Sequence, residues 1–318
     1  MFELRWNPVI KWWVMVSSSR QNRPLLPKDS CPFCPGSPKV PEKYSVMIYP
    51  NDFPILALDP EKPTSKNKKL YKVARSYGKC EVVLYSSQHE QSFSSMPEKQ
   101  LIKVIELWTE RYRELGREKH IKYVFIFENK GEVVGVTIHH PHGQIYGYPF
   151  IPKKIQAELN SCRAYFKKNK RCLYCDIMEE EIKDSRRMVC ENESFVAFVP
   201  FFAEYPYQVF VLLREHKLSL DEFNRKEKED LAEILKRITK AYDRLFNMPF
   251  PYMMCFHQKP TDGKSYEYYH FHIEFYPPMR NEKTQKFNAS SETGAWVHGN
   301  PTCPEEKAKE LKEEIERG

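Results

Sequence analysis

A set of motifs that occurs twice in the same order constrains the fold of this chain more than any other feature. In each half, a C-x-x-C pair is followed by a histidine, a predicted amphipathic helix, a predicted strand and an H-x-H motif. Motifs repeated in a fixed order indicate a duplicated structural unit. We therefore predict two similar halves, residues 1–165 and 166–318, of which the first carries the sequence H-P-H-G-Q.

The segments between these motifs predict a mixture of helices and strands. Apolar residues three and four positions apart over 97–119 and 220–246 are typical of amphipathic helices. A turn is predicted at 128–131, and a charged helix with a solvated face at 305–316. Short apolar runs predict strands at 12–16, 80–85, 123–127, 209–213 and 252–256.

The charge pattern argues against a nucleic-acid-binding protein. The net charge is +7, but the 50 basic and 43 acidic residues are interleaved, whereas nucleic-acid-binding modules cluster basic and aromatic residues. A zinc-knuckle module, which the paired cysteines suggest, is thus the weaker interpretation, and a small anionic substrate is favoured. Because no apolar run approaches the roughly 18 residues of a membrane helix, we expect a soluble, cytoplasmic protein.

The cysteine and histidine motifs predict two metal sites. In a chain without a recognisable export signal, C-x-x-C pairs are more often metal ligands than disulfides. Two thiolates and two imidazoles suit tetrahedral zinc with no open position, which is a structural site. The first set is Cys31, Cys34, His89 and His140, and the repeat predicts a second set, Cys172, Cys175, His216 and His270. The alternative for each pair is a tight turn with free thiols.

Three histidines fall within four positions and are followed directly by Gly143 and Gln144. If this segment is extended, His140 and His142 point to one side of a strand and His139 to the other. With His140 assigned to zinc, His142 is left for chemistry, and a neutral imidazole is a good nucleophile towards phosphorus. Gly143 would allow a phosphate close to the main chain, and Gln144 adds a neutral donor. The alternative is a strand end with satisfied core histidines.

Together with other motifs along nearly the whole chain, this pattern resembles the galactose-1-phosphate uridylyltransferase family of the histidine-triad superfamily. The resemblance is specific because many short motifs agree at once. Besides H-P-H-G-Q they are W-N-P at 6–8, V-S at 16–17 with Arg20 and Arg23, C-P-F-C-P-G at 31–36, N-D-F at 51–53, S-Q-H at 87–89, F-E-N-K-G at 127–131, F-Y-P-P at 275–278, K-F at 286–287 and S-E-T-G-A at 291–295.

The resemblance implies an α+β fold of two tandem histidine-triad-like halves, each an antiparallel half-barrel sheet with flanking helices, assembled as a homodimer. It implies that His142 attacks the α-phosphorus of UDP-glucose, releases glucose 1-phosphate and carries UMP. Galactose 1-phosphate would then take the uridylyl group to give UDP-galactose, and Gln144 would hold the phosphoryl oxygens. In the second half, His272 is followed by Ile-Glu, so we expect that half to be catalytically degenerate.

The same resemblance implies three groups of substrate-binding residues. The residues that would hold the uridine and ribose are Phe33, Asn51, Asp52 and Phe53. Those that would line the phosphate and sugar site are Asn129 and Thr137. Those that would reach the site across the dimer are Arg20, Arg23, Lys286, Phe287 and Glu292.

Three positions depart from the family pattern and leave the substrate open. Thr137 stands where the family often has Ser, which keeps a hydroxyl. Ser291 and His298 stand where some members carry Tyr and Gln, so the hexose is not fixed. An ADP-sugar phosphorylase of the same superfamily is the alternative activity.

The second metal is also open. Some family members bind it through a Glu and three His and lack the second C-x-x-C pair. Glu158, His257 and His272 are candidates for that site, but Glu274 stands where the third His should be. The intact second C-x-x-C pair therefore favours a second zinc.

Overall fold

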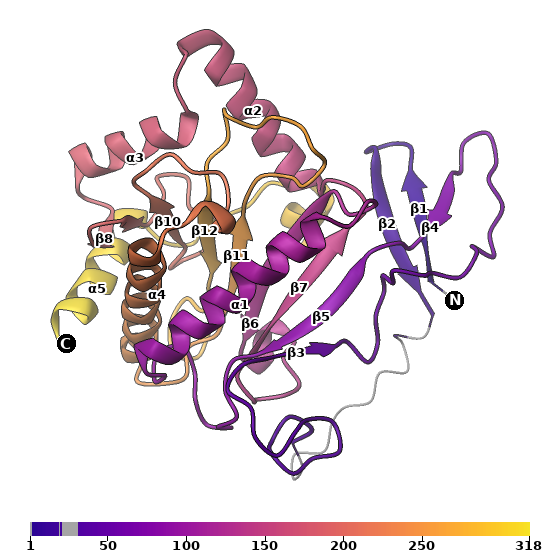
Figure 1. Ribbon diagram of the computed structural model, residues 1–318. Coiled ribbons are helices and arrows are strands. Elements are labelled where there is room, and N and C mark those ends of the chain that lie inside the picture. The colour runs from indigo at the N-terminus through magenta and orange to yellow at the C-terminus, as the bar shows by residue number, and fades with distance from the viewer. Residues whose placement is uncertain (1, 19, 21–30) are drawn as a thin grey trace.

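The structure, a computed structural model, describes residues 2–18, 20 and 31–318. In that part of the chain, nine antiparallel strands form one large sheet (Figure 1). Across the sheet the strands are β3 (Met47–Pro50), β5 (Lys79–Leu84), β7 (His142–Tyr148), β6 (Tyr123–Lys130), β11 (Tyr252–His257), β12 (His272–Tyr276), β10 (Val209–Leu213), β9 (Phe195–Phe198) and β8 (Met188–Glu191).

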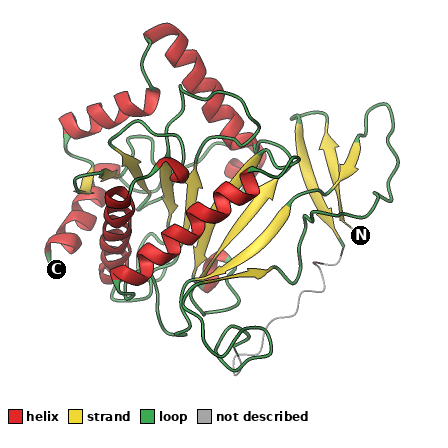
Figure 2. Ribbon diagram, viewed as in Figure 1, coloured by secondary structure: helices red, strands yellow, loops and turns green. Residues whose placement is uncertain are grey.

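The prediction of two antiparallel halves is confirmed, and the structure adds how the halves meet. The first four strands of this order come from the first half of the chain and the others from the second. The halves join edge to edge, because β6 pairs with β11 and places Glu128 opposite Met254. The two predicted sheets are therefore continuous, as Figure 2 shows.

Helices α1 (Glu98–Gly116) and α4 (Arg225–Leu245) pack against one face of this sheet. The apolar stripe of α1 buries Trp108 completely, and its ring lies 4.9 Å from that of Phe256 in β11, so the helix predicted at 97–119 is confirmed. The helix predicted at 220–246 is interrupted. A short 3-10 helix, η3 (Leu220–Glu222), comes first, and α4 then begins after Asn224, which caps it in a capping box with Glu227.

Helices α2 (Lys153–Asn169) and α3 (Leu173–Asp184) cover the opposite face of the second half. The alternation of β10 shows the two faces: Val209 and Val211 pack on the α1 and α4 side, Phe210 and Leu212 on the α2 and α3 side. These two helices are not among the elements predicted from the sequence. The division of the chain at residues 165 and 166 stays a prediction.

A small sheet, β2 (Trp12–Ser17), β1 (Phe2–Asn7) and β4 (Val73–Arg75), lies beside the first half (Figure 1). The C-terminal helix α5 (Pro304–Glu316) corrects one expectation. Ala308 and Leu311 are fully buried in the same core as α4, so this charged helix has an apolar face and is not merely solvated.

The chain between β6 and the histidines is irregular and does not form an extended strand. Strand β6 continues to Lys130, and the turn falls at Gly131, whose φ of 98° favours glycine. A 3-10 helix, η2 (Glu132–Val134), follows, and β7 begins only at His142. His139 and His140 therefore precede the strand.

Candidate active site and metal clusters

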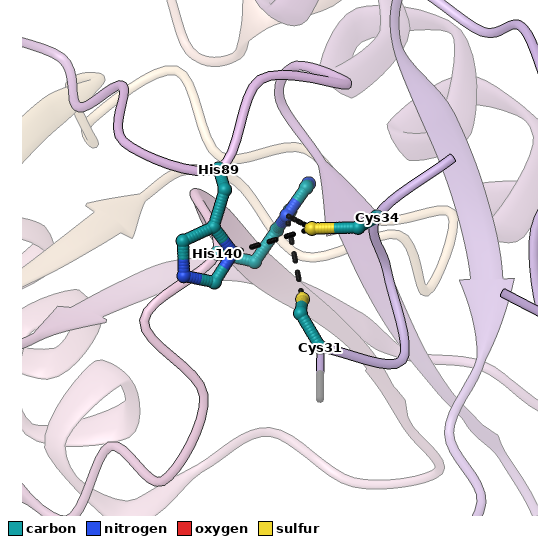
Figure 3. Close-up of side chains that lie close together, drawn as sticks. All are labelled: Cys31, Cys34, His89 and His140. Atoms are coloured by element: carbon teal, nitrogen blue, oxygen red, sulfur yellow. Dashed lines mark hydrogen bonds between the residues drawn. The ribbon is translucent and has the colours of Figure 1, made fainter. Parts of the chain in front are cut away.

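The cysteine and histidine motifs of the first half meet in space, as the repeat predicts (Figure 3). The Cys34 Sγ lies 3.4 Å from the His89 Nδ1 and 3.8 Å from the His140 Nδ1. The Cys31 Sγ lies 3.6 Å from the same His140 atom. Zinc bonds of about 2.3 Å to sulfur and about 2.0 Å to nitrogen give tetrahedral edges of about 3.5 Å. This cluster has the spacing of a tetrahedral metal site.

Hydrogen bonds fix the orientation of His140. Its Nε2 lies 2.7 Å from the carbonyl oxygen of Ser86 and 2.8 Å from the hydroxyl of Tyr44. Because a carbonyl only accepts, Nε2 carries the hydrogen and Nδ1 presents its lone pair to the cysteines. Burial lowers the pKa of His140 to about 4, so the ring is neutral at physiological pH, as a metal ligand must be.

The second predicted set is arranged in the same way. The Cys175 Sγ lies 3.5 Å from the His216 Nδ1 and 3.4 Å from the His270 Nδ1. The Nε2 of His270 faces the Leu213 carbonyl at 2.8 Å, and that of His216 faces the Glu267 carbonyl at 3.0 Å. Both rings therefore direct Nδ1 at the thiols, and Cys172 completes a second Cys2His2 cluster that could hold a metal ion.

A third cluster in the described chain contains Glu158, His257, His272 and Glu274. Its carboxylates and imidazoles already contact one another: Glu158 lies 3.0 Å and Glu274 3.5 Å from His257. The ammonium group of Lys154 also lies 2.7 Å from Glu274. Lys154 is not among the residues predicted from the sequence, and Glu274 is not counted there as a ligand. Glu274, one of the candidate ligands, is therefore already engaged in an ion pair with Lys154.

His142 is held by the main chain just before it. Its Nδ1 lies 2.7 Å from the carbonyl oxygen of His140, so Nδ1 carries the hydrogen and the lone pair is on Nε2. The prediction that His140 and His142 share one strand face is wrong in detail, because only His142 is in β7. His139 does point elsewhere, towards exposed Glu132 at 3.2 Å.

Gln144 lies two positions further along β7 and so on the same face as His142. The hydroxyl of Tyr146 donates to the Gln144 side-chain oxygen at 3.2 Å. With its oxygen engaged in this way, the amide can direct its two N–H donors at a ligand. The side chains of β7 therefore present an imidazole and an amide together.

Two cavities meet at His142. The first, of about 170 Å³, is bounded by His142 and Gln144 and by the predicted uridine-binding residues Phe33, Asn51, Asp52 and Phe53. The second, of about 250 Å³, is bounded by His142 and Asn129. Thr137 lies between Val136 and Ile138, which line the second cavity. His142 thus lines both the cavity with the predicted nucleoside-binding residues and the cavity with the predicted sugar-binding residue Asn129.

Two residues of the first cavity were missed by the sequence analysis. The ammonium group of Lys39 lies 2.5 Å from one oxygen of Asp52, and the hydroxyl of Tyr49 donates to the other at 2.8 Å. Neither residue belongs to a motif that could have signalled the contact: Lys39 lies in a loop 13 positions before Asp52, and Tyr49 lies in β3. Together they fix the carboxylate of Asp52 at the cavity wall.

The structure does not bring every predicted residue to His142. Among the described residues, Arg20, Lys286, Phe287 and Glu292 line neither of these cavities, and Arg23 lies outside the described part. Lys286 instead contacts Glu292 at 2.8 Å and the Gly299 carbonyl at 2.9 Å. That ion pair holds the pKa of Glu292 at about 2. The described members of this group are therefore not part of the cavity walls within one chain.

Family models match both halves of the chain. The N-terminal domain of galactose-1-phosphate uridyl transferase matches residues 2–152, and its C-terminal domain matches residues 158–311. The chain belongs to the galactose-1-phosphate uridylyltransferase family. The resemblance inferred from the short motifs is thereby confirmed for both halves.

Relatives in this family are similar over most of their length. The galactose-1-phosphate uridylyltransferase of Thermotoga maritima is 42% identical, covering 98% of each chain. That of Saccharomyces cerevisiae is 34% identical, covering 89% of this chain and 86% of its own. A solved uridylyltransferase structure superposes with a TM-score of 0.91 at 34% identity, covering 99% of each chain.

A more distant structure shares the fold alone. An ADP-glucose phosphorylase from Arabidopsis thaliana, solved with bound ADP-glucose, superposes with a TM-score of 0.77 at 23% identity, covering 98% of each chain. Within the described residues, no helix is both long and apolar enough to cross a membrane.

Proposed function

We propose that this chain transfers UMP from UDP-glucose to galactose 1-phosphate through a uridylyl-histidine intermediate on His142. The observation that carries the proposal is the orientation of this residue. Its Nδ1–H donates to the His140 carbonyl at 2.7 Å, and the ring lies where the two cavities meet. An imidazole held in one tautomer has its Nε2 lone pair ready for attack, without a separate base to remove a proton.

The chemistry proceeds in two displacements. The Nε2 lone pair of His142 forms a bond to the α-phosphorus of UDP-glucose, and the bond from phosphorus to the bridging oxygen breaks. Glucose 1-phosphate leaves with that electron pair. An oxygen of galactose 1-phosphate then attacks the same phosphorus, and the P–N bond breaks to return the neutral imidazole. Splitting the transfer in this way replaces one difficult step by two easier ones.

The other residues of the site bind and orient the substrate. The first cavity would take the uridine, with Phe33 and Phe53 beside it and Asp52, fixed by Lys39 and Tyr49, facing its polar groups. The second cavity would take the hexose phosphate beside Asn129 and the segment that carries Thr137. The amide of Gln144 would donate to the phosphoryl oxygens as charge develops on them.

We also propose that zinc fills both Cys2His2 clusters. The S···N distances suit zinc at both clusters, and in the first cluster the lowered pKa of His140 keeps that ring neutral. Four protein ligands leave no open position, so the metal contributes stability and takes no part in the reaction. In the first half, it would fix His140, whose carbonyl in turn holds the ring of His142. The zinc thereby supports the orientation of the nucleophile.

The choice between uridylyl and adenylyl transfer is tested by direct comparison of substrates. We expect turnover with UDP-glucose and galactose 1-phosphate to exceed turnover with ADP-glucose and phosphate by about 100-fold or more in kcat/KM, since a buried site built for one base leaves polar groups unpaired with another. Faster reaction with ADP-glucose would assign the chain to the phosphorylase activity instead.

We further propose a homodimer with composite sites, to which Arg20, Arg23, Lys286, Phe287 and Glu292 contribute from the neighbouring subunit. It is supported by their position, since within one chain none of the described members of this group reaches His142. Phe287 is 66% exposed, which leaves its ring available to a second subunit.

A mixture of two inactive chains tests this arrangement. Lys286→Ala and His142→Ala homodimers should each be nearly inactive. Co-expression of the two should restore about one quarter of wild-type activity, because half of the dimers are hybrids with one intact site each. A fully active monomer, or a mixture with no recovered activity, would contradict the composite site.

A further inference from the structure

Glu128 is a buried carboxyl in the wall of the second cavity, and the proposed reaction does not use it. It is 6% exposed, and its Oε1 accepts a hydrogen bond from the hydroxyl of Tyr252 at 3.0 Å. Tyr252 belongs to β11, so this bond crosses the junction between the two halves. The Oε2 of Glu128 has no hydrogen-bond partner among the described residues, and neither has the buried hydroxyl of Tyr85.

Tyr85 contacts the catalytic segment on both sides of His142. Its backbone N–H donates to the carbonyl oxygen of Pro141 at 3.0 Å. Its hydroxyl packs under Gly143 so closely that a methyl group added there would lie 1.9 Å from the phenol oxygen. A shift of the Tyr85 phenol would therefore displace the main chain at Gly143 and, with it, the adjacent His142.

We infer that Glu128 is a positioning residue for His142: its carboxylate bridges the hydroxyls of Tyr85 and Tyr252 and so holds the Tyr85 phenol beneath Gly143. This inference rests on the proposed role of His142 as nucleophile. Two buried polar atoms without partners in one small region are rare in native proteins, and a hydrogen bond from Tyr85 to Glu128 satisfies both. The second half of the chain, which has lost its own catalytic motif, then supports the catalytic strand through Tyr252.

The bridge depends on the ionisation of Glu128. Burial raises its pKa to about 7, although the hydrogen bond from Tyr252, the charge of Lys130 and the phenol of Tyr85 act to lower it. Lys130, on the same strand, is itself paired at 2.7 Å with Asp243 of α4. An ionised carboxylate accepts from both tyrosines, whereas a protonated one must use one oxygen as a donor. The support is therefore complete above pH 7 and weakens as the pH falls through that value.

The second cavity, which Glu128 helps to line, also contains other titratable side chains. The experiment must separate their effects from that of Glu128. The cavity is also lined by Glu90, His89, His139, His140 and His142. The pH profile of the wild type alone does not identify the group that titrates. Glu128→Gln distinguishes these groups, because it removes the titration of this one group and keeps the size of the side chain.

The experiment measures the single-turnover rate of uridylyl-enzyme formation from UDP-glucose between about pH 5.5 and pH 9. The wild-type rate should rise through a midpoint near pH 7. In Glu128→Gln that step should disappear, and the rate at pH 8 should be about 10- to 100-fold lower, since a misplaced nucleophile costs rate in this range. Tyr252→Phe should move the midpoint up by about one pH unit, because the ionised carboxylate loses a donor.

Tyr242→Phe is the matched control. The hydroxyl of Tyr242 is also buried and donates one hydrogen bond, to the Tyr207 carbonyl at 2.8 Å, but it lies outside the bridge. Its midpoint should equal that of the wild type. If the rise in rate near pH 7 persists in Glu128→Gln, the inference is overturned. If that variant does not fold, an unshifted midpoint in Tyr252→Phe overturns the inference instead. If the wild type forms no uridylyl-enzyme, the proposed function falls, and the role of Glu128 falls with it.

Discussion

His142→Ala should lower kcat by about 10⁵-fold or more, while the variant folds and keeps both metal clusters. The imidazole is the only group placed to form the covalent bond in the proposed mechanism, and removal of a nucleophile that acts with its supporting groups leaves only the binding contribution to catalysis. Because His142 lies on the surface of β7 between two cavities and is not a cluster ligand, the loss should not extend to stability. Steady-state turnover and a thermal melt measure the two effects.

His120→Ala is the matched control for this change. It removes an exposed imidazole whose ring lies 4.7 Å from that of Tyr77 and which lines neither cavity. We expect turnover within about two-fold of the wild type, because surface substitutions away from a site have small effects. If His120→Ala were as damaging as His142→Ala, or if His142→Ala kept substantial turnover, the assignment of the nucleophile would be wrong.

Cys31→Ser should unfold the first half of the protein as well as abolish activity. Structural zinc contributes roughly 10–16 kcal/mol to the folding of isolated zinc-finger peptides, so loss of one thiolate should lower the free energy of unfolding by about 4 kcal/mol or more. The effect reaches the reaction through His140, whose carbonyl holds the ring of His142. Metal analysis of the wild type should give two zinc ions per chain, and a denaturant titration gives the stability.

Cys303→Ser provides the matched control, because Cys303 is exposed and belongs to neither Cys2His2 cluster. It should leave metal content and stability unchanged. If the protein holds a single zinc per chain and Cys172→Ser retains it, the second cluster does not bind zinc. A Cys31→Ser protein with wild-type stability would contradict the structural role of the first.

The sequence predicts those parts of the molecule that depend on local spacing. The amphipathic stripe around Trp108 indicates α1 because its period is that of a helix. The two Cys2His2 sets follow from the repeat, since each C-x-x-C pair and its histidines occur in the same order. The structure then places their ligand atoms within 4.8 Å of one another.

Contacts between distant segments could not be predicted. Nothing in the sequence indicates that β6 pairs with β11, or that the hydroxyl of Tyr252 donates to Glu128. The ion pair of Lys154 with Glu274 likewise depends on the packing of α2 against β12. Each of these joins residues more than a hundred positions apart, whose meeting is decided by the complete fold.

The late start of β7 has a local cause that the sequence analysis overlooked. Pro141 has no backbone N–H and cannot donate to a neighbouring strand, so the ladder with β5 begins after it, where His142 pairs with Leu84. The segment before it is free to leave the sheet, and His140 turns towards the cysteines. A proline between the two histidines thus separates the ligand from the nucleophile.

Intact-protein mass spectrometry after incubation with UDP-glucose alone tests the covalent mechanism most directly. With no acceptor sugar present, the wild type should gain the mass of one uridylyl group, and peptide mapping should place it on His142. Addition of galactose 1-phosphate should remove the adduct, and His142→Ala should never form it. An unmodified wild-type enzyme that is fully active with both sugars would show a single displacement and contradict the account.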